Sequence, residues 1–381
     1  MDIYERLQVK KMINAAGTYT VIGGSRMSQT TLQAMAEAAA YHVDLPQLQR
    51  AVGRRLAELT RNEAAYVTCG AAAALYLSIA ACAAKKLQRP LARLTPDVVA
   101  DCEVIVHRAH RNAYDWALRQ LGVKIVDIGY PNDMSPTQPE DLLEAINDNT
   151  VALFYAWTEP GGWVPPGALT LAQTLEIAGR YNVPVIVDAA AQLPPMENLW
   201  RFTEAGAAAA VFSGGKDLRG PQASGLLVGK QWLVDLILDT GFPTHGIGRM
   251  LKVGREEMVG LLSAVEQYVS CDHIARRAWC ETQVNRFIEA FADDADVEVV
   301  RSFPNEAGQP LPRAIFRLIA SWAPPTAELI ALLKSGTPAI YTIPADEGGI
   351  YLNPMTLRED EVGVIIHRLR EIVGQLRQTQ G

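Results

Sequence analysis

Short apolar runs alternate with helix-forming segments through the middle of this 381-residue chain, and this alternation limits the folds open to it. Residues 151–157 and 183–187 are apolar almost throughout, as strands buried on both faces of a sheet are. Residues 169–181, between them, have the spacing of a helix. Because parallel strands need such crossovers, the pattern predicts an α/β fold with a mainly parallel sheet covered by helices. The other expected strands are residues 102–107, 123–128, 208–212 and 225–228, and the other expected helices are residues 113–121 and 139–146.

The last third of the chain has a different pattern, in which long helices over 256–270 and 273–291 precede short strands. A final helix is expected to begin with a capping box formed by Thr356 and Glu359 and to end near Leu376. The short strands are expected at residues 297–301, 313–319, 339–343 and 349–352. The domain prediction has three parts: an N-terminal segment, 1–43, that packs on the small domain or at a dimer interface, a large α/β domain, 44–250, and a smaller α+β domain, 251–381.

Composition excludes several classes of protein. The net charge is -7 and no block of lysine or arginine occurs, whereas phosphate contacts with nucleic acid require a basic face. Five cysteines occur without CxxC spacing, which fits reduced thiols better than a disulfide framework. The N-terminus lacks the pattern of a signal peptide, and the longest apolar stretch, 71–84, is too short to span a bilayer. We therefore expect a cytoplasmic protein with a small-molecule substrate and with neither a nucleic-acid nor a membrane partner.

A lysine preceded by two glycines follows the strand expected at 208–212. The glycines before Lys216 would let the backbone approach a flat ring closely. Partial burial and a nearby cation would allow the amine to lose its proton and form a Schiff base. Ser213 would offer its hydroxyl to a phosphate oxygen. An ordinary turn lysine is the alternative, whereas a phosphate-binding GxxxxGK[ST] loop is excluded because positions 210 and 217 break that pattern.

An aspartate, Asp188, closes the apolar run 183–187. In open parallel sheets ligands bind outside the carboxyl ends of the strands, so this carboxylate lies where a ligand would bind. It would hold a pyridine nitrogen protonated, which makes the ring an electron acceptor. A helix N-cap is the alternative role. Together, Asp188 and Lys216 indicate a pyridoxal phosphate enzyme with these two residues as its catalytic pair.

A phosphate site is predicted where a short strand turns into a helix of small residues. The backbone N–H groups at this turn would face an anion at the helix N-terminus. The residues of the turn are Cys69, Gly70, Ala71 and Ala72, and a plain strand-to-helix turn is the alternative.

Several other positions are weaker candidates for cofactor binding. His107 and His110 have the i, i+3 spacing of metal ligands, but no third ligand is evident nearby, so no metal site is expected. We expect His110 to stack on the cofactor ring and Gln192 to reach the cofactor hydroxyl. The glycine-rich bend at residues 244–249 would be an interdomain turn or a segment offered to the cofactor phosphate by a partner subunit, through Thr244 and Gly246.

The substrate candidates are four residues. Thr18 and Tyr19 belong to an unusual small-and-polar stretch, 14–20, that would line a substrate entrance. Arg249 lies at the end of the glycine-rich bend, and Arg313 offers two parallel donors to a substrate carboxylate.

Taken together, these segments resemble the fold-type I pyridoxal phosphate enzymes over essentially the whole chain. More narrowly, the chain is similar to the group of bacterial selenocysteine synthase (L-seryl-tRNA(Sec) selenium transferase), which includes D-glucosaminate-6-phosphate ammonia-lyase-like proteins. The resemblance is carried by residues 13–18, 185–190, 213–216, 220–225 and 251–257, with 111–115 adding to the likeness with the ammonia-lyase branch.

The resemblance implies a mainly parallel sheet of the seven-stranded type and a homodimer, or a larger homo-oligomer, with active sites at the dimer interface. It implies that Lys216 carries the covalent imine and that Asp188 pairs with the pyridine nitrogen. It also implies that the turn at 69–72, with Ser213, holds the phosphate.

The reaction expected by analogy is that of a lyase. Removal of an α-proton and β-elimination of water would release ammonia and a 2-oxo acid from a small amino acid or amino-sugar acid. A racemase or an aminotransferase would use the same residues, and a non-catalytic protein that binds the cofactor is a further alternative. Selenium transfer on seryl-tRNA is less expected, because the resemblance begins almost at the first residue and the chain is acidic.

Overall fold

The computed structural model describes residues 1–158 and 162–378 and divides the chain into two compact units. The large unit comprises residues 25–271 and 306–309, and the small unit comprises 1–24, 272–305 and 310–381. The large domain was predicted to span 44–250, so the observed large unit extends beyond the prediction at both ends.

The difference arises from a helix pair in the large unit. Helix α2 (Gln29–Ala39) packs against α10 (Arg255–Val269), and Arg255 Nε donates a hydrogen bond of 2.9 Å to the carbonyl of Ala38. Residues 25–43 and 251–271 therefore belong with the large sheet.

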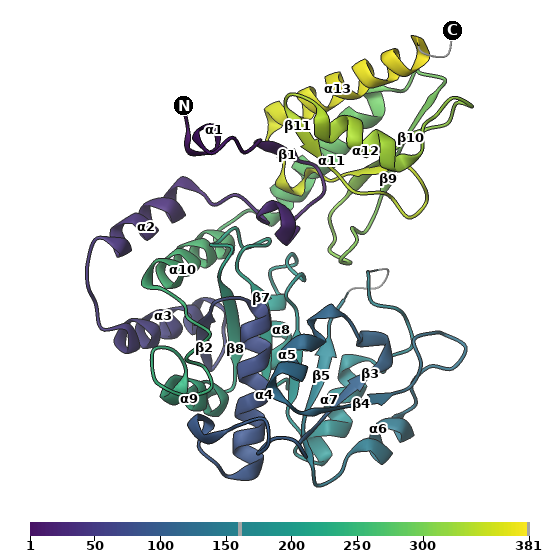
Figure 1. Cartoon of the computed structure of the whole chain (residues 1–381). Helices are drawn as coiled ribbons and strands as arrows, with labels where there is room; N and C mark the ends of the chain where they lie inside the picture. The colour runs from purple at the N-terminus through teal and green to yellow at the C-terminus, as the bar shows by residue number, and fades with distance from the viewer. Residues whose placement is uncertain (159–161, 379–381) are drawn as a thin grey trace. The chain divides into compact units, whose positions relative to one another are not determined.

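A seven-stranded sheet forms the centre of the large unit, in the order β2-β8-β7-β6-β5-β3-β4 (Figure 1). Strand β8 runs antiparallel to both of its neighbours, and every other pair is parallel. The strands are β2 (Ala64–Thr68), β3 (Glu103–His107), β4 (Lys124–Ile128), β5 (Thr150–Ala156), β6 (Val185–Asp188), β7 (Ala209–Ser213) and β8 (Gly225–Gly229). This arrangement confirms the predicted α/β class and mainly parallel sheet.

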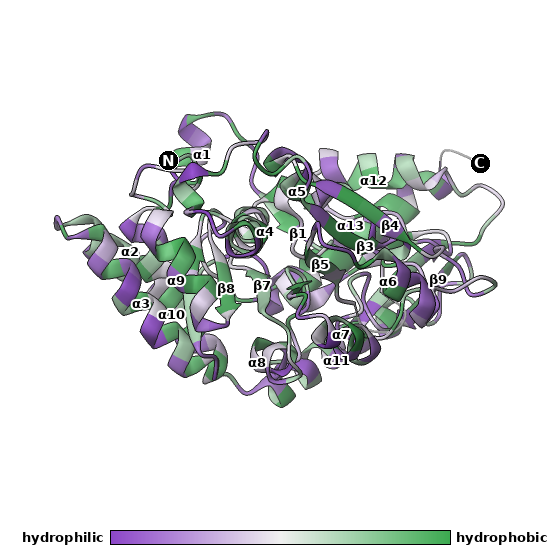
Figure 2. Cartoon of the chain, turned by 90° about the horizontal axis from the view of Figure 1, so that it is seen from below, coloured by the Kyte–Doolittle hydropathy of each residue, from purple (hydrophilic) through white to green (hydrophobic). Residues whose placement is uncertain are grey.

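Helices cover both faces of this sheet. Val104 and Val106 of β3 point into one hydrophobic core, whereas Ile105 between them points into the other. Figure 2 shows β8 as a hydrophobic ribbon and α10 with hydrophilic stretches. One face packs against α4 (Ala71–Leu87), α5 (Trp116–Leu121) and α9 (Gln231–Thr240), and the other packs against α3 (Leu45–Leu59), α6 (Pro139–Ala145), α7 (Leu171–Arg180), α8 (Asn198–Glu204) and α10. Short 3₁₀ turns occur at Thr20–Ile22, Leu91–Arg93, Arg108–His110 and Ala113–Asp115, the last replacing the first turn of the helix expected at 113–121.

The small unit contains an antiparallel sheet in the order β12-β10-β9 and a separate pair in which β1 is parallel to β11. Its three long helices share one hydrophobic core with these strands. The elements are α1 (Ile3–Arg6), β1 (Met12–Asn14), α11 (His273–Ala290), β9 (Val297–Ser302), β10 (Arg313–Leu318), α12 (Thr326–Ser335), β11 (Ala339–Tyr341), β12 (Ile350–Leu352) and α13 (Glu359–Gln378).

The predicted capping box of the last helix is wrong. The backbone N–H of Arg358 donates to the Glu361 carboxylate at 2.7 Å, so the acid that caps α13 lies two residues later than expected. The Thr356 hydroxyl instead donates to the carbonyl of Asn14 at 2.8 Å, at the end of the 3₁₀ turn Pro354–Thr356. Within residues 1–158 and 162–378, none of the helices has the length and hydropathy needed to span a membrane.

Candidate active site

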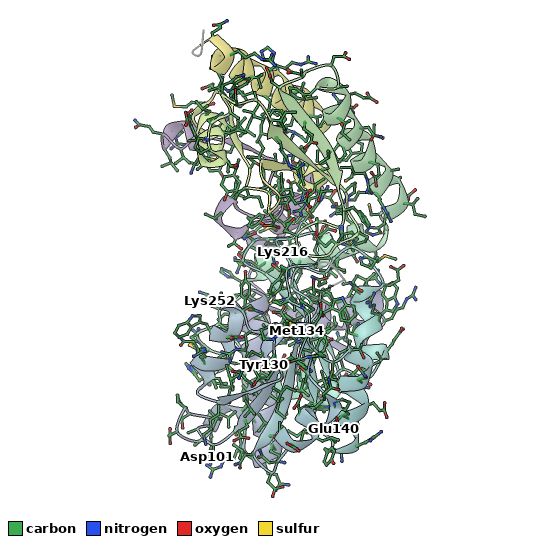
Figure 3. The ribbon with its side chains drawn as sticks, turned by 90° about the vertical axis from the view of Figure 1, so that its right-hand side faces the viewer. Asp101, Tyr130, Met134, Glu140, Lys216 and Lys252 are labelled. Carbon is green, nitrogen blue, oxygen red and sulfur yellow. The ribbon has the colours of Figure 1, made fainter. Side chains whose placement is uncertain are left out.

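The two predicted catalytic residues lie at one edge of the large sheet. Strand β6 ends at Asp188, and its neighbour β7 is paired with it in parallel register, so that Asp188 lies opposite Val211. Lys216 follows the end of β7, and Figure 3 shows it at the opposite end of the large unit from Asp101. The carboxyl ends of parallel strands thus bring both residues to the same edge.

Asp188 is buried, with 7% of its surface exposed. One of its carboxylate oxygens accepts the backbone N–H of Ala190 at 3.0 Å. Burial raises the pKa of Asp188, and the Ala190 hydrogen bond and the charge of Lys216 oppose that rise. A cationic ring nitrogen beside this carboxylate would favour its ionised form further.

Lys216 belongs to a compact loop between β7 and β8. The N–H of Gly214 donates to Ser224 O at 2.9 Å, and both the N–H and the hydroxyl of Ser25 donate to Gly215 O at 2.9 Å. A Cβ at Gly214 would lie 2.0 Å from Ser224 Oγ, so this position accepts no side chain. Burial lowers the pKa of Lys216, and the charges of Asp188 and Glu306 oppose that change. The amine therefore loses its proton more readily than a lysine in water.

Glu306 is a site residue that the sequence analysis missed. It opens the 306–309 segment, which lies in the last third of the chain but belongs to the large unit. Ala307 O accepts hydrogen bonds from Gln192 Nε2 at 2.7 Å and Thr158 Oγ1 at 3.2 Å, and Gln309 Nε2 donates to Leu193 O. No sequence pattern near Glu306 indicates this placement, because the contacts are made with distant segments.

The predicted phosphate turn lies at the same edge. Register places Thr68 of β2 opposite Gly225 of β8, and Gly225 opposite Ser213 of β7, so that the three residues form one row. A Cβ at Gly225 would lie 2.4 Å from the carbonyl carbon of Gly70, which explains why the row includes a glycine.

The start of α4 also fits an anion. Gly70 is its N-cap, no side chain caps the helix there, and a Cβ at Gly70 would meet nothing within 4 Å. Ala71 is partly exposed and Ala72 is exposed, while Cys69 is partly buried, and burial raises the pKa of its thiol. Uncapped N–H groups beside open space fit a phosphate.

His110 lies within a cluster of rings at the carboxyl end of β3. Its ring is 5.0 Å from that of His107 and 4.4 Å from that of Tyr155. Burial lowers the pKa of His107 to about 4, and burial together with His107 lowers that of His110 to about 3. Both imidazoles are therefore neutral at pH 7, as suits stacking on a neutral or cationic ring. The described residues contain no group of three His, Cys, Asp or Glu side chains that could hold a metal ion.

The structure places the other cofactor candidates in different surroundings. Gln192 is buried beside the 306–309 segment, where its amide donates to Ala307 O. A Cβ at Gly246 would lie 3.2 Å from both Ala92 Cα and the carbonyl oxygen of Thr240, so the bend packs against the 3₁₀ turn Leu91–Arg93 and the end of α9. The role of Thr244 and Gly246 at the cofactor phosphate stays a prediction.

The substrate candidates are divided between the units. Arg249 is exposed in the large unit, with its guanidinium 5.2 Å from the ring centroid of Phe242. Thr18 and Tyr19 belong to the small unit and are half-buried. Arg313 also belongs to the small unit, where its guanidinium lies 3.4 Å above the Tyr351 ring. Their roles toward a substrate stay predictions.

The chain is similar to proteins of known activity over its whole length. The family model for L-seryl-tRNA selenium transferase (SelA) matches residues 12–296. D-glucosaminate-6-phosphate ammonia lyase of Salmonella typhimurium is 32% identical over 97% of this chain and 98% of its own length. A 5'-C-glycyluridine monooxygenase-decarboxylase of a Streptomyces species is 30% identical over 97% of this chain and 92% of its own.

L-seryl-tRNA(Sec) selenium transferases are more distant. That of Pasteurella multocida is 25% identical over 76% of this chain and 64% of its own length. Among solved structures, that of D-glucosaminate-6-phosphate ammonia-lyase has a TM-score of 0.84 at 30% identity and covers 99% of both chains. A cysteine desulfurase from Thermococcus onnurineus, 16% identical with a TM-score of 0.58 over 96% of this chain and 95% of its own, shares the fold.

These comparisons confirm the predicted fold type, the cofactor and the ammonia-lyase-like enzyme class. The residues present fit that cofactor, because a buried carboxylate, a lysine with a lowered pKa and an uncapped helix N-terminus share one sheet edge. This chain belongs to the L-seryl-tRNA selenium transferase (SelA) family and is an enzyme that uses pyridoxal phosphate.

Proposed function

We propose that this enzyme is an ammonia lyase for an amino-sugar acid. It would release ammonia and a 2-oxo acid from a substrate with an α-amino group and a β-hydroxyl, and the water lost from the β-carbon would be balanced by the water used in the final hydrolysis. The observation that carries the proposal is the full-length similarity to D-glucosaminate-6-phosphate ammonia lyase, combined with the Asp188–Lys216 pair at one sheet edge.

The roles proposed for the residues follow from their places in the fold. Pyridoxal phosphate, when bound, supplies an electron-accepting ring that stabilises negative charge at the substrate α-carbon. Lys216 would hold the cofactor covalently and, as a free amine, would take the α-proton on Nζ, which its lowered pKa favours. Asp188 would accept a hydrogen bond from the ring nitrogen, and the start of α4, with Ser213, would hold the phosphate.

The bonds and protons balance without a further reactant besides water. The α-proton would pass to Lys216, the β-carbon–oxygen bond would break, and the oxygen would leave as water after taking a proton from the Lys216 ammonium. The released product tautomerises and hydrolyses to the 2-oxo acid and ammonia.

The assembly and location belong to the same proposal. A homodimer or larger homo-oligomer would allow Thr244 and Gly246 of one subunit to reach the phosphate site of another, as expected from the sequence. A cytoplasmic location and the absence of a nucleic-acid partner remain predictions from composition.

A second candidate activity is supported by the relative named a monooxygenase-decarboxylase, which is nearly as similar to this chain as the lyase. Lys216 and Asp188 would serve that reaction too, because loss of carbon dioxide also leaves negative charge at the α-carbon.

One experiment separates the two activities. The purified holoenzyme is incubated with D-glucosaminate 6-phosphate, with and without oxygen, while ammonia, 2-oxo acid and carbon dioxide are measured. We expect equal amounts of ammonia and 2-oxo acid, independent of oxygen. Oxygen-dependent release of carbon dioxide would instead support the decarboxylase, and inversion of the substrate without ammonia would support a racemase.

A further inference from the structure

The N-terminal part of the chain contacts the loop that carries Lys216 through one half-buried residue, Ser25. Ser25 is the first residue of the large unit, and residues 1–24 before it belong to the small unit. Its backbone N–H and its hydroxyl both donate to Gly215 O at 2.9 Å. A backbone carbonyl has two lone pairs, so Ser25 alone uses the full accepting capacity of this oxygen.

The carbonyl that Ser25 holds is part of the peptide group between Gly215 and Lys216. A peptide group is planar, so its oxygen and the Cα of Lys216 lie in one plane. Fixing the oxygen therefore fixes the direction in which the Lys216 side chain leaves the backbone. Because that side chain is a long flexible stem, its amine is placed only as precisely as its Cα.

The other carbonyls around Lys216 are satisfied inside the lysine loop, residues 214–224. Gly214 O accepts the N–H of Gly220 at 2.8 Å, and Lys216 O accepts the N–H of Arg219 at 3.0 Å. Gly215 O, between them, takes its hydrogen bonds from a segment 190 residues away in the chain. The loop therefore holds its own shape on both sides of Gly215 and depends on Ser25 at that residue.

Helix α10 supports both partners of this contact. A Cβ at Gly260 of α10 would lie 2.7 Å from Cγ of Met35, in α2, and 2.7 Å from Cγ of Pro221, in the lysine loop. Helix α2 begins four residues after Ser25, so the segment that carries Ser25 and the lysine loop rest on the same helix. Close packing on a shared support keeps the separation of Ser25 and the loop constant.

We propose that Ser25 is a positioning residue for Lys216, which holds the Gly215–Lys216 peptide in the orientation from which the amine reaches the cofactor and the α-proton. The proposal deepens the proposed function, on which it rests, by naming the residue that aims the base. Ser25 itself takes no proton and carries no charge. Functional groups need such support, because a reacting group displaced by about 1 Å can lose about 10²-fold in rate.

The first test follows covalent attachment of the cofactor, in which the amine nitrogen bonds to the aldehyde carbon and water leaves. Cofactor-free full-length protein is mixed with saturating pyridoxal phosphate, and the imine absorbance gives a first-order rate constant. Ser25→Ala removes the hydroxyl and keeps the N–H. We expect the rate constant to fall about 2- to 13-fold, the loss of one neutral hydrogen bond, and Ser25→Thr, which keeps the hydroxyl, to restore it.

The second test separates positioning from binding in the holoenzyme with D-glucosaminate 6-phosphate. Ser25→Ala should lower kcat by a similar factor and leave KM unchanged, because the orientation of the base matters for proton removal and not for substrate binding. A rise in KM with unchanged kcat would mean that Ser25 contributes to substrate binding instead, and would overturn the proposal.

The matched control is Ser335→Ala. The Ser335 hydroxyl also donates to a backbone carbonyl, that of Leu332 at 3.1 Å, but it lies in the small unit on α12. This variant should attach the cofactor at the wild-type rate, and circular dichroism should show all variants folded. A wild-type attachment rate in Ser25→Ala, an equal fall in Ser335→Ala, or failure of Ser25→Thr to restore the rate would overturn the proposal. Absence of ammonia release by the wild type would reject the proposed lyase reaction, and the attachment rates would still decide the role of Ser25.

Discussion

Two halves of one sheet edge have opposite electrostatic character. At the ends of β6 and β7, burial acts on Asp188 and Lys216, but their opposite charges counteract its effect on the pKa of each. At the ends of β3 and β5, burial acts on His107 and His110 with no opposing charge, and both imidazoles are neutral at pH 7. The first half retains the proton equilibria needed for catalysis, whereas the second offers neutral rings for binding.

The largest expected effect comes from removing the lysine of the charged half. Lys216→Ala should lower activity by at least about 10³-fold, because the base and the covalent attachment are both lost. Mass spectrometry after hydride reduction should find the cofactor on Lys216 in the wild type and on no residue of the variant. Lys124→Ala is the matched control, since Lys124 is exposed and pairs with Asp101. Labelling of another lysine in the wild type would contradict the assignment.

The second-largest loss of activity is expected from removing the Asp188 carboxylate. Asp188→Asn should lower kcat by about 10²- to 10³-fold, because an amide does not favour a protonated ring nitrogen. The pKa of Lys216 should also fall, since the charge of Asp188 raises it. The pH dependence of the rate at which trinitrobenzenesulfonate labels Lys216 in the cofactor-free protein measures this shift, with Asp101→Asn as control. A variant with full activity and an unchanged pH profile would show that Asp188 has only a structural role.

The neutral half is tested through the pH dependence of stability. His107 has a folded-state pKa of about 4, below its unfolded value, so its contribution to stability is present above pH 6.5 and is lost as pH falls below that value. Between pH 6.5 and 5 the loss reaches about 2 kcal/mol. Asp188 acts in the opposite sense, because its pKa is raised.

His107→Phe keeps a ring and removes this titration. Urea unfolding at pH 7.5 and pH 5 should therefore show a smaller difference in the free energy of unfolding for the variant than for the wild type. His42→Phe, at an exposed position, should keep the wild-type difference. Equal differences in wild type and His107→Phe would mean that this imidazole is already charged or accessible to water.

The smallest effect on activity is expected from removing the charge of Glu306. Its charge raises the pKa of Lys216 less than that of Asp188 does, so Glu306→Gln should lower that pKa by less than Asp188→Asn. The expected result is a shift of the acidic limb of the activity profile toward lower pH, because the base loses its proton at lower pH, with kcat reduced only a few-fold. Glu204→Gln, exposed at the end of α8, serves as control. A profile identical to that of the wild type would show that Glu306 does not act on the lysine.

The local sequence pattern was enough to predict the central strands of the large sheet and the catalytic pair. Apolar runs predicted β5 and β6, because central strands of a covered sheet are apolar on both faces. Asp188 was identifiable because a charge directly after such a run must lie at a strand end, and Lys216 because the glycines before it have no role in a strand or helix.

Contacts between segments that are far apart in the sequence could not be predicted from local patterns. The placement of Glu306 depends on hydrogen bonds from Thr158 and Gln192, which no spacing in the sequence reveals. The bounds of the large unit were missed for the same reason, since α2 is an ordinary helix until α10 packs against it.

The 306–309 segment also has a consequence for biosynthesis. Ribosomes deliver the chain from its N-terminus, so residues 25–271 emerge before the carbonyl of Ala307 exists to receive Gln192 and Thr158. A nascent chain released too early would therefore carry the lysine and aspartate in an unfinished pocket. Completion of the catalytic centre is thereby tied to translation of the C-terminal third.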